Sequence, residues 1–366
     1  MNKKKIAKIM ICAFLVIIIA GGCVAWAFLP HPLNYDIKGI EPLGIDTVEI
    51  AETETDSVTL RKKDGKPYKI IFFSDIHLDG NNKTSNTTLE NMIAAIRKEK
   101  PDLVLLGGDN VTSAFNSKRS HQLAEIFEKL GIYWGGVIGN HEGDNPYSIK
   151  REKMADIFSS YDRCIMLKGI SEIDGNCNYA INLTDRSGKL LETVFCLDTF
   201  DEMSDELRNH YDLPEDSKGI DGAHENQVKW FADKAASIKE KYGEYTGVML
   251  MHIPLPQLGE AAENEENFIR GSKGENVCCT SFDSGLFEEM KKAGISAAYF
   301  GHDHNNNFAV NIDGIELAYL ETSGYGSYGL HKKGYPEEEW LQGYSVSVVS
   351  PGKSTFEQFT YYDALK

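Results

Sequence analysis

The 366-residue sequence has no Cys-x-x-Cys pair, although it contains seven cysteines. This absence excludes a zinc ribbon and a thioredoxin-type redox site, because both need such a pair. Cys12 and Cys23 fall in an apolar N-terminal segment, which leaves an odd number of cysteines elsewhere. If the chain is exported, one or two disulfides are possible, but the sequence does not predict their pairing. For Cys164 and Cys196 we favour buried, small hydrophobic side chains.

Basic residues are scarce relative to acidic ones. The chain has 38 lysines and arginines against 55 aspartates and glutamates, which gives a formal net charge of −17. This sign argues against a protein that binds nucleic acid phosphates over a broad surface. A local reversal of the charge would need bound cations.

One long apolar run stands at the N-terminus. Residues 6–29 are almost wholly apolar after Lys8 and follow a basic cluster at 3–5, and this length suffices for a transmembrane helix. The charge asymmetry predicts a single-pass protein of the cell membrane, with a cytoplasmic N-terminus and an extracytoplasmic main domain. We favour this signal-anchor over cleavage as a signal peptide at the small residues 21–25 or lipidation at Cys23, which would give a secreted or a lipid-anchored protein.

The remaining chain divides into a short polar stretch and one large domain. Residues 1–30 are the expected anchor or signal segment, and residues 31–66 are polar with early prolines. We expect 31–66 to be a stalk or linker with one edge strand. No internal repeat or second hydrophobic core is evident, so a single domain is expected over 67–366.

A regular alternation opens this domain. Apolar runs at 68–75, 101–109 and 132–142 predict strands, and the spacing of apolar residues at 89–100 and 123–130 predicts helices. Strand, helix, strand, helix and strand in succession indicate parallel pairing through right-handed crossovers, in a sheet buried on both faces.

The second half is richer in strands. Turn signals between these strands favour antiparallel hairpins, so we predict an α/β fold, a sandwich of two mixed sheets flanked by helices. Strands are expected at 190–198, 247–252, 296–301, 307–312, 315–320 and 343–349, and helices at 225–242 and 284–293.

A stretch without clear periodicity interrupts this half. Residues 253–283 are long for a loop in a compact domain, and such loops are often functional, so we expect a lid here. Arg270 and Lys273 in this stretch are candidates to meet an anionic ligand.

Polar residues cluster where the predicted strands end. Taken singly, each has an ordinary interpretation as the start of a turn or a helix cap. Taken together they point to the crevice beyond the carboxyl ends of the strands, where ligands bind in such sheets. They are Asp75 and His77 after the first strand, Asp109 after the second, Asn140 and His141 after the third, His252 after a later one, and His302 and His304 after the next.

Seven of these side chains offer carboxylate, amide or imidazole donors. This mixture suits divalent manganese, iron or zinc better than magnesium or calcium. Seven donors exceed the usual need of one ion, and they serve two divalent metal ions well if one carboxylate bridges them.

The blocks D-x-H, GD-x, GNH(E/D), a lone H and GH-x-H, in this order, resemble the signature of the calcineurin-like metallophosphoesterases, which include the purple acid phosphatases. The resemblance covers the chain from Asp75 to His304. It implies a four-layer α/β/β/α sandwich and a two-metal hydrolase.

The resemblance also implies roles for individual residues. Asp109 bridges the ions, and His141 stabilises the phosphoryl oxygens and protonates the leaving group. Hydroxide held by the two ions attacks phosphorus directly, without a covalent intermediate. Asp303 points elsewhere. The first ion takes Asp75, His77, Asp109 and His304, and the second takes Asp109, Asn140, His252 and His302.

The chain departs from the purple acid phosphatases at one position. Thr112 stands where they carry the tyrosine that binds ferric iron, so we predict a colourless enzyme with divalent ions, manganese or iron first and zinc next. The segment ENQVKWF at 225–231 resembles a helix with Gln and Trp in phosphatase relatives, although an amphipathic helix alone would explain it. Five histidines outside the pattern are expected at the surface or in local bonds: His31, His121, His210, His224 and His331.

The leading hypothesis is a metal-dependent phosphoesterase tethered outside the cytoplasm. It would hydrolyse phosphomonoesters or small phosphodiesters, so its partners are a small phosphorylated substrate and, through the N-terminal helix, the membrane. No protein partner follows from the sequence. Two alternatives are a non-catalytic protein that binds a phosphorylated ligand through its metal site, and a nuclease, which the net charge disfavours.

Overall fold

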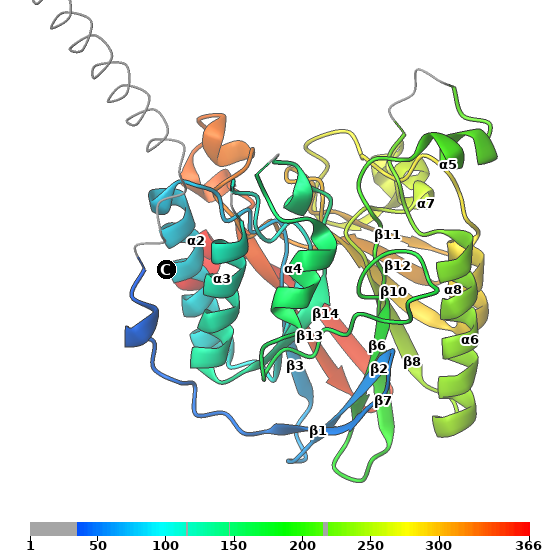
Figure 1. The fold of residues 1–366 in the computed structure, drawn as a ribbon, viewed down its shortest axis with the longest axis horizontal. Helices are drawn as coiled ribbons and strands as arrows, with labels where there is room; N and C mark the ends of the chain where they lie inside the picture. Colours follow the sequence, from blue (N-terminus) through cyan, green and yellow to red (C-terminus); the bar gives the residue numbers. More distant parts are fainter. Residues whose placement is uncertain (1–34, 115, 146, 215–218) are drawn as a thin grey trace, which may run out of the picture.

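The computed structural model describes residues 35–366 except 115, 146 and 215–218. Its strands form two mixed sheets (Figure 1). The first sheet has nine strands, in the order β1 (Val48–Thr53), β2 (Ser57–Lys62), β6 (Tyr179–Thr184), β7 (Leu190–Cys196), β8 (Thr246–Leu250), β10 (Ile295–Phe300), β12 (Ile315–Tyr319), β11 (Ala309–Ile312) and β9 (Phe268–Arg270). The second has five, in the order β14 (Lys353–Thr360), β13 (Gly343–Ser350), β3 (Tyr68–Phe73), β4 (Leu103–Gly107) and β5 (Tyr133–Val137).

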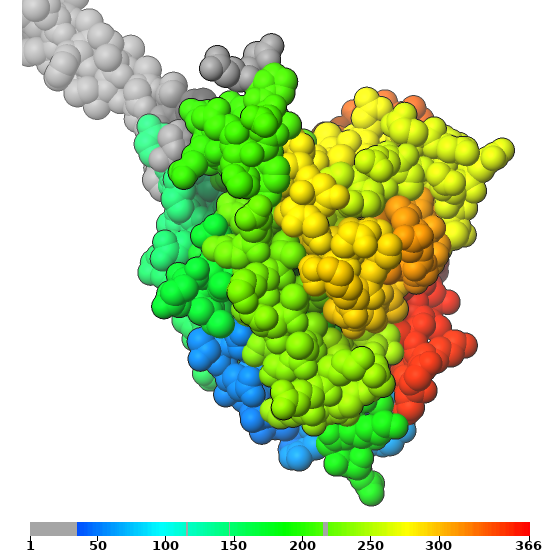
Figure 2. Space-filling model, turned by 90° about the vertical axis from the view of Figure 1, so that its right-hand side faces the viewer, coloured from blue at the N-terminus to red at the C-terminus, as the bar shows by residue number. Residues whose placement is uncertain are grey.

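Helices cover the outer faces of both sheets. Figure 1 shows α2 (Asn82–Glu99), α3 (Ser117–Leu130) and α4 (Arg151–Phe158) on one side and α6 (Glu225–Tyr242) and α8 (Leu286–Ala293) on the other, with the sheets between them. Figure 2 looks onto the face made by α6 and α8. The shorter helices are α5 (Asp205–His210), α7 (Pro256–Ala261) and α9 (Tyr361–Leu365). The predicted sandwich of two sheets flanked by helices is confirmed.

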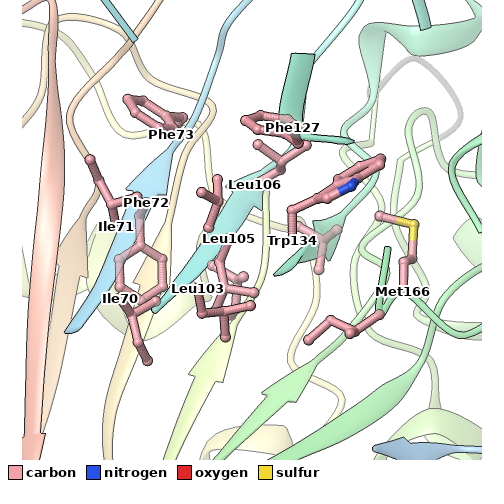
Figure 3. Packing of buried hydrophobic residues seen from close by; sticks show 14 of the residues in the cluster. Ile70, Ile71, Phe72, Phe73, Leu103, Leu105, Leu106, Phe127, Trp134 and Met166 are labelled. Carbon is pink, nitrogen blue, oxygen red and sulfur yellow. The ribbon is translucent and has the colours of Figure 1, made fainter. Parts of the chain in front are cut away.

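The strand sequences explain the layers. From Val194 in β7, along β8 and from Ala297 in β10, successive side chains alternate between the core that both sheets share and the core beneath α6 and α8, as the two-residue period of a strand requires. In β3 and β4 nearly every residue is buried and apolar, because one face meets the other sheet and the opposite face meets α2 and α3. Figure 3 shows these side chains packed with Phe127 and Trp134.

The predicted alternation of strands and helices at the start of the domain is also confirmed. β3, β4 and β5 pair in parallel, and α2 and α3 are the crossovers between them. α2 begins earlier than its apolar spacing suggested, because Asn81 caps it by accepting a hydrogen bond from the backbone N–H of Lys83. The expected hairpin at 307–320 is β11 with β12. The strand expected at 343–349 is β13, which forms a further hairpin with β14, a strand that was not predicted.

Two segments differ from expectation. The stretch 31–66 contains both β1 and β2, and β2 pairs in parallel with β6 inside the sheet rather than at its edge. The stretch 253–283 contains α7 and β9, and β9 pairs with β11. Both pairings join segments far apart in the chain, so local periodicity could not reveal them.

The expectation of a cell-membrane location is corrected. Across residues 35–366, outside the gaps named above, no helix is both long enough and apolar enough to cross a bilayer. The apolar run at 6–29, on which that expectation rested, lies outside the described residues.

Candidate metal centre

The polar residues singled out in the sequence come together where the strands of both sheets end. Asp75 and His77 follow β3, Asp109 follows β4 and Asn140 follows β5. The large sheet supplies the other three ligand candidates, His252 after β8 and His302 and His304 after β10. The site therefore lies between the sheets, and neither sheet carries the whole set.

Four side chains form a compact buried group. One ligand atom from each of Asp75, His77, Asp109 and His304 lies within 4.8 Å of the others. The Nε2 atoms of His77 and His304 are 3.1 Å apart. His304 Nε2 lies 3.3 Å from the Oδ1 atom of Asp75, and His77 Nε2 lies 3.5 Å from the Oδ2 atom of Asp109. This is the set proposed for the first ion.

A second group shares Asp109. His252 is fully buried, and its Nε2 atom lies 3.3 Å from the Oδ2 atom of Asp109. The ring centroids of His302 and His252 are 5.3 Å apart. The Nδ1 atom of His302 lies 2.9 Å from the Oδ1 atom of Asn140. Asp109 thus stands between two sets of donors, as a bridging carboxylate would.

The backbone is strained where the ligands leave the strands. Asp75, His77, Asp109 and His302 have positive φ angles, of 51°, 43°, 51° and 78°. Left-handed conformations cost non-glycine residues about 1–3 kcal/mol each and persist only where the surrounding structure enforces them. Such strain concentrates at functional sites, and four of the nine non-glycine residues with positive φ in the described part of the chain are these donors.

Backbone carbonyls orient two of the imidazoles. His252 Nδ1 lies 2.7 Å from the carbonyl oxygen of Gly107, and His304 Nδ1 lies 3.0 Å from that of Tyr328. A carbonyl only accepts, so each Nδ1 carries the hydrogen. In the neutral ring the Nε2 lone pair then points into the site, which is the arrangement of metal-binding histidines.

Buried atoms without a hydrogen bond test whether a cation fits this site. The Oδ2 atom of Asp109 and the Nε2 atom of His252 are buried and make no hydrogen bond, although they lie 3.3 Å apart. Buried polar atoms are normally paired. Burial alone would lower the pKa of His252, but the neighbouring carboxylate of Asp109 raises it to about 10. The site therefore attracts positive charge where a cation would lie, and the residues fit a metal centre.

Two histidines are prepared to act as neutral ligands. Burial lowers the pKa of His77 to about 3 and that of His302 to about 4. Both rings are then uncharged near neutral pH, and a lone pair is free on each.

His141 lies at the rim of the buried group. Its side chain is 46% exposed, its backbone N–H donates to the Oδ1 atom of Asp109 at 2.9 Å, and its Nδ1 atom bonds to the carboxylate of Asp144. Beside it opens a cavity of about 390 Å³, large enough for a small ligand. His77, Thr112, His141, Asp144, Asn145, Gly326 and Ser327 line this cavity.

Sequence reasoning missed two supporting residues, Glu142 and Asp144. Glu142 is buried and accepts hydrogen bonds from the backbone N–H and the side-chain amide of Asn110, at 2.6 Å and 3.0 Å, and it thereby holds the loop after β4. Asp144 follows His141 within one turn. Glu142 belongs to a block that the sequence had marked, whereas nothing in the sequence distinguished Asp144.

Asp303 has hydrogen-bond partners of its own, although one of its carboxylate oxygens lies within 4.8 Å of a ring nitrogen of His302. Asp303 accepts a hydrogen bond from the backbone N–H of Cys278 at 3.0 Å and one from the hydroxyl of Tyr319. The described histidines outside the pattern make local contacts, His121 with Tyr161, His210 with Glu225, His224 with Asp174 and Asp221, and His331 with the carbonyl of Tyr325. His31 is outside the described residues.

Arg270 and Lys273, which were expected to meet an anionic ligand, bind other groups of the protein. Arg270 pairs with Glu316 at 2.5 Å on the edge of the large sheet, and Lys273 donates to the carbonyl of Ala262 at 3.0 Å. The structure does not bring either of them into the cavity beside His141. The five described cysteines are unpaired, and Cys196 is buried as expected, whereas Cys164 is partly exposed.

The fold is an α/β sandwich of two sheets flanked by helices. The buried Asp/His cluster at the strand ends is suited to bind two metal ions. The chain belongs to the calcineurin-like phosphoesterase family, whose sequence model matches residues 68–306. The resemblance drawn from the five sequence blocks is therefore confirmed.

The similarity to individual proteins also extends over most of the chain. "Probable inactive purple acid phosphatase 14" of Arabidopsis thaliana is 26% identical over 341 residues, with 83% of this chain and 80% of its own length covered. "Probable inactive purple acid phosphatase 29" of the same plant is 25% identical over 293 residues, with 72% and 73% covered. The solved structure of a dimetal phosphatase from Danio rerio has a TM-score of 0.49 and 14% identity, with 81% of this chain and 100% of that chain covered.

Proposed function

We infer that this protein is a metal-dependent phosphoesterase that hydrolyses phosphomonoesters or small phosphodiesters. The observation that carries the proposal is the pair of buried atoms without a hydrogen bond, Asp109 Oδ2 and His252 Nε2. His77, whose Nε2 atom lies 3.5 Å from that Asp109 oxygen, lines a cavity together with His141. A cation centre open to a small polar cavity is the minimum that this chemistry needs. We assign this activity to residues 67–366, with β1 and β2 completing the large sheet.

The proposed ligand sets follow the two groups around Asp109. When bound, two divalent ions polarise a phosphoryl group and lower the pKa of water, which makes water a nucleophile near neutral pH. We expect manganese or iron first and zinc next, because the donors mix oxygen and nitrogen. Asp75, His77, Asp109 and His304 would hold one ion, and Asp109, Asn140, His252 and His302 would hold the second ion.

His141 would act on the substrate rather than on the ions. Its Nδ1 atom is engaged by Asp144, so Nε2 is the atom available to a phosphoryl oxygen or to the leaving group. A histidine in this position can donate a proton to a leaving alkoxide. Thr112, Asn145 and Ser327 add polar side chains to the cavity wall.

The cavity has a size that fits a small substrate. A volume of about 390 Å³ matches a small phosphorylated molecule. The net charge of −17 disfavours the approach of a long polyanion, so nucleic acid is an unfavourable substrate.

A second candidate is a non-catalytic protein that binds a phosphorylated ligand. The names of the two Arabidopsis relatives favour it, since both contain the word "inactive". Against it, the seven proposed ligands and His141 are all present in this chain.

Metal reconstitution tests the proposal. The full chain would be stripped of metal, supplied with Mn²⁺, Fe²⁺, Zn²⁺ or Mg²⁺ one at a time, and assayed on para-nitrophenyl phosphate and its bis ester. We expect activity to return with about two ions per chain, measured by elemental analysis. Two bound ions with no hydrolysis of either ester would favour the binding-protein candidate.

Replacing the rim histidine separates catalysis from metal binding. His141→Ala should retain the parent metal content and lose about 10²- to 10⁴-fold in turnover, the usual contribution of a positioned acid. His121→Ala, which removes an exposed histidine bonded to Tyr161, should leave both unchanged. Full turnover in His141→Ala would refute the assigned role.

A further inference from the structure

The loop that carries Asn140 and His141 is held on two sides. On one side, the backbone N–H of His141 donates to Asp109. On the other side lies Arg151, the first residue of α4, whose side chain is buried. Its Nε atom donates to the carbonyl of Gly139 at 2.7 Å, and its Nη2 atom lies 3.4 Å from the carbonyl oxygen of Ile138.

The guanidinium is anchored to the other sheet. Arg151 forms an ion pair with Asp198, which is fully buried just after β7. The carboxylate of Asp198 also accepts the backbone N–H of Phe200 at 3.0 Å and that of Asn176 at 2.7 Å. These bonds fix the carboxylate from several directions, so Arg151 has little freedom to move.

Helix α6 completes the network. The Nε2 atom of Gln227 lies 2.8 Å from the carbonyl oxygen of Asp198 and 2.8 Å from the Oδ1 atom of Asn178. The same Asn178 oxygen accepts the backbone N–H of Asp198 at 3.0 Å. The segment ENQVKWF thus does more than pack Trp230 and Phe231, because its glutamine fixes the aspartate that fixes Arg151.

The loop is packed closely against Asp109 at Gly139. A Cβ atom on Gly139 would stand 2.2 Å from both the backbone nitrogen and the Oδ1 atom of Asp109. The carbonyl that Arg151 holds belongs to the peptide that leads into Asn140. A small rotation of this peptide would therefore displace Asn140 relative to Asp109, and metal donors need placement to within about 0.5 Å.

Stability alone does not account for this arrangement. A buried ion pair often contributes no more to folding than well-packed apolar side chains of the same volume. Here the guanidinium uses its fork of donors on two carbonyls of one loop and on one carboxylate, a task that suits arginine and not lysine.

We propose that Arg151, anchored by Asp198, is a positioning residue that holds the Asn140–His141 loop against Asp109 and thereby sets the affinity for the second ion. The inference rests on the proposed metal centre. Loss of this support should weaken binding of the second ion about 10- to 100-fold, the usual effect of removing an outer support of a metal site, and leave the first ion in place.

Binding of Mn²⁺ to the metal-free full chain tests this without any substrate. Arg151→Met and Arg151→Lys would be titrated by calorimetry and by electron paramagnetic resonance, which distinguishes an isolated Mn²⁺ from a coupled pair. We expect one tight ion in both variants, with the coupled pair forming only at about 10- to 100-fold higher Mn²⁺. Excess Mn²⁺ should then restore much of any turnover, which a general folding defect would not allow.

Lys62→Met is the matched control. Lys62 forms a buried ion pair with Asp102 at 2.6 Å, and Asp102 precedes β4 at the end opposite Asp109. This variant should bind both ions as the parent does. Two ions bound with parental affinity in Arg151→Lys and Arg151→Met would overturn the proposal.

The outcome is separable from the proposed function. If the parent binds two ions and hydrolyses nothing, the phosphoesterase proposal fails while the metal titrations still judge Arg151. If Arg151→Met does not fold, Arg151→Lys and Asp198→Asn decide, since the first keeps the charge beside Asp198 and the second keeps the guanidinium.

Discussion

At the scale of single residues, the site is built from positions that break local rules. Asp75, His77, Asp109 and His302 adopt positive φ angles that side chains of their type disfavour. Natural sequences tolerate such conflicts where function demands them and the surrounding packing offsets the cost. The glycines of the same blocks serve this geometry, since they leave the space that the ligand side chains occupy.

Gly139 is the sharpest case. Gly139→Ala should displace Asp109, because the added Cβ would lie 2.2 Å from its Oδ1 atom. We expect loss of metal binding and a fall of about 1–3 kcal/mol in the free energy of unfolding, the usual cost of overpacking. Elemental analysis and urea denaturation measure the two effects.

Gly65→Ala provides the comparison. A Cβ on Gly65 meets no atom within 4 Å, so this variant should keep its metal and its stability. Normal metal content in Gly139→Ala would mean that the loop can move away from Asp109, contrary to the role given to Arg151.

At the scale of elements, β7 carries a buried carboxylic acid remote from the metal centre. Glu192 is 1% exposed and accepts a hydrogen bond from Ser354 of β14, across the two sheets. Burial raises the pKa of Glu192 from 4.5 to about 7. The folded state therefore binds this proton more tightly than the unfolded state does, and the associated stability is present below pH 4.5 and is lost as the pH rises to about 7.

Glu192→Gln should remove this pH dependence. Relative to the parent, the variant should gain up to about 3 kcal/mol in the free energy of unfolding between pH 5 and pH 8, given 1.36 kcal/mol per unit of pKa. Urea denaturation at several pH values measures the gain. Glu357→Gln, at an exposed position on β14, should show none, and a parallel pH profile for Glu192→Gln and the parent would contradict the argument.

The elements also show what the sequence could predict. Strands such as β3 and β4 are continuous apolar runs, and their ends place Asp75 and Asp109 by simple order along the chain. β6 contains a buried Asn182, and β9 has only three residues, so neither gives a periodic signal. The pairing of Arg151 with Asp198 joins positions that are 47 residues apart, and no local pattern encodes that contact.

At the scale of the whole molecule, the metal centre joins the two sheets. The small sheet supplies Asp75, His77, Asp109 and Asn140, whereas the large sheet supplies the three remaining histidines. Bound ions would therefore connect the sheets at the strand ends, where otherwise unpaired carboxylate and imidazole groups face one another. Metal should stabilise the fold as a whole and not only the site.

Removal of metal tests this connection. With each ion present at about 100 times its Kd, binding contributes about 2.7 kcal/mol per ion, so chelation should lower Tm by roughly 4–8 °C for a chain of this size. Differential scanning fluorimetry with and without chelator measures the shift. Asp109→Asn, which removes the shared carboxylate charge, should show little shift, and an equal shift in this variant would place the stabilising ion elsewhere.

The division of the ligands between the sheets also orders events during synthesis of the chain. A nascent chain that has emerged from the ribosome only as far as α4 already carries Asp75, Asp109 and Asn140, but none of the histidines that follow β8 and β10. β3 then waits for β13, which pairs with it from residues 343–350. Acquisition of both ions is consequently a late step in biogenesis, after nearly the whole polypeptide has been made.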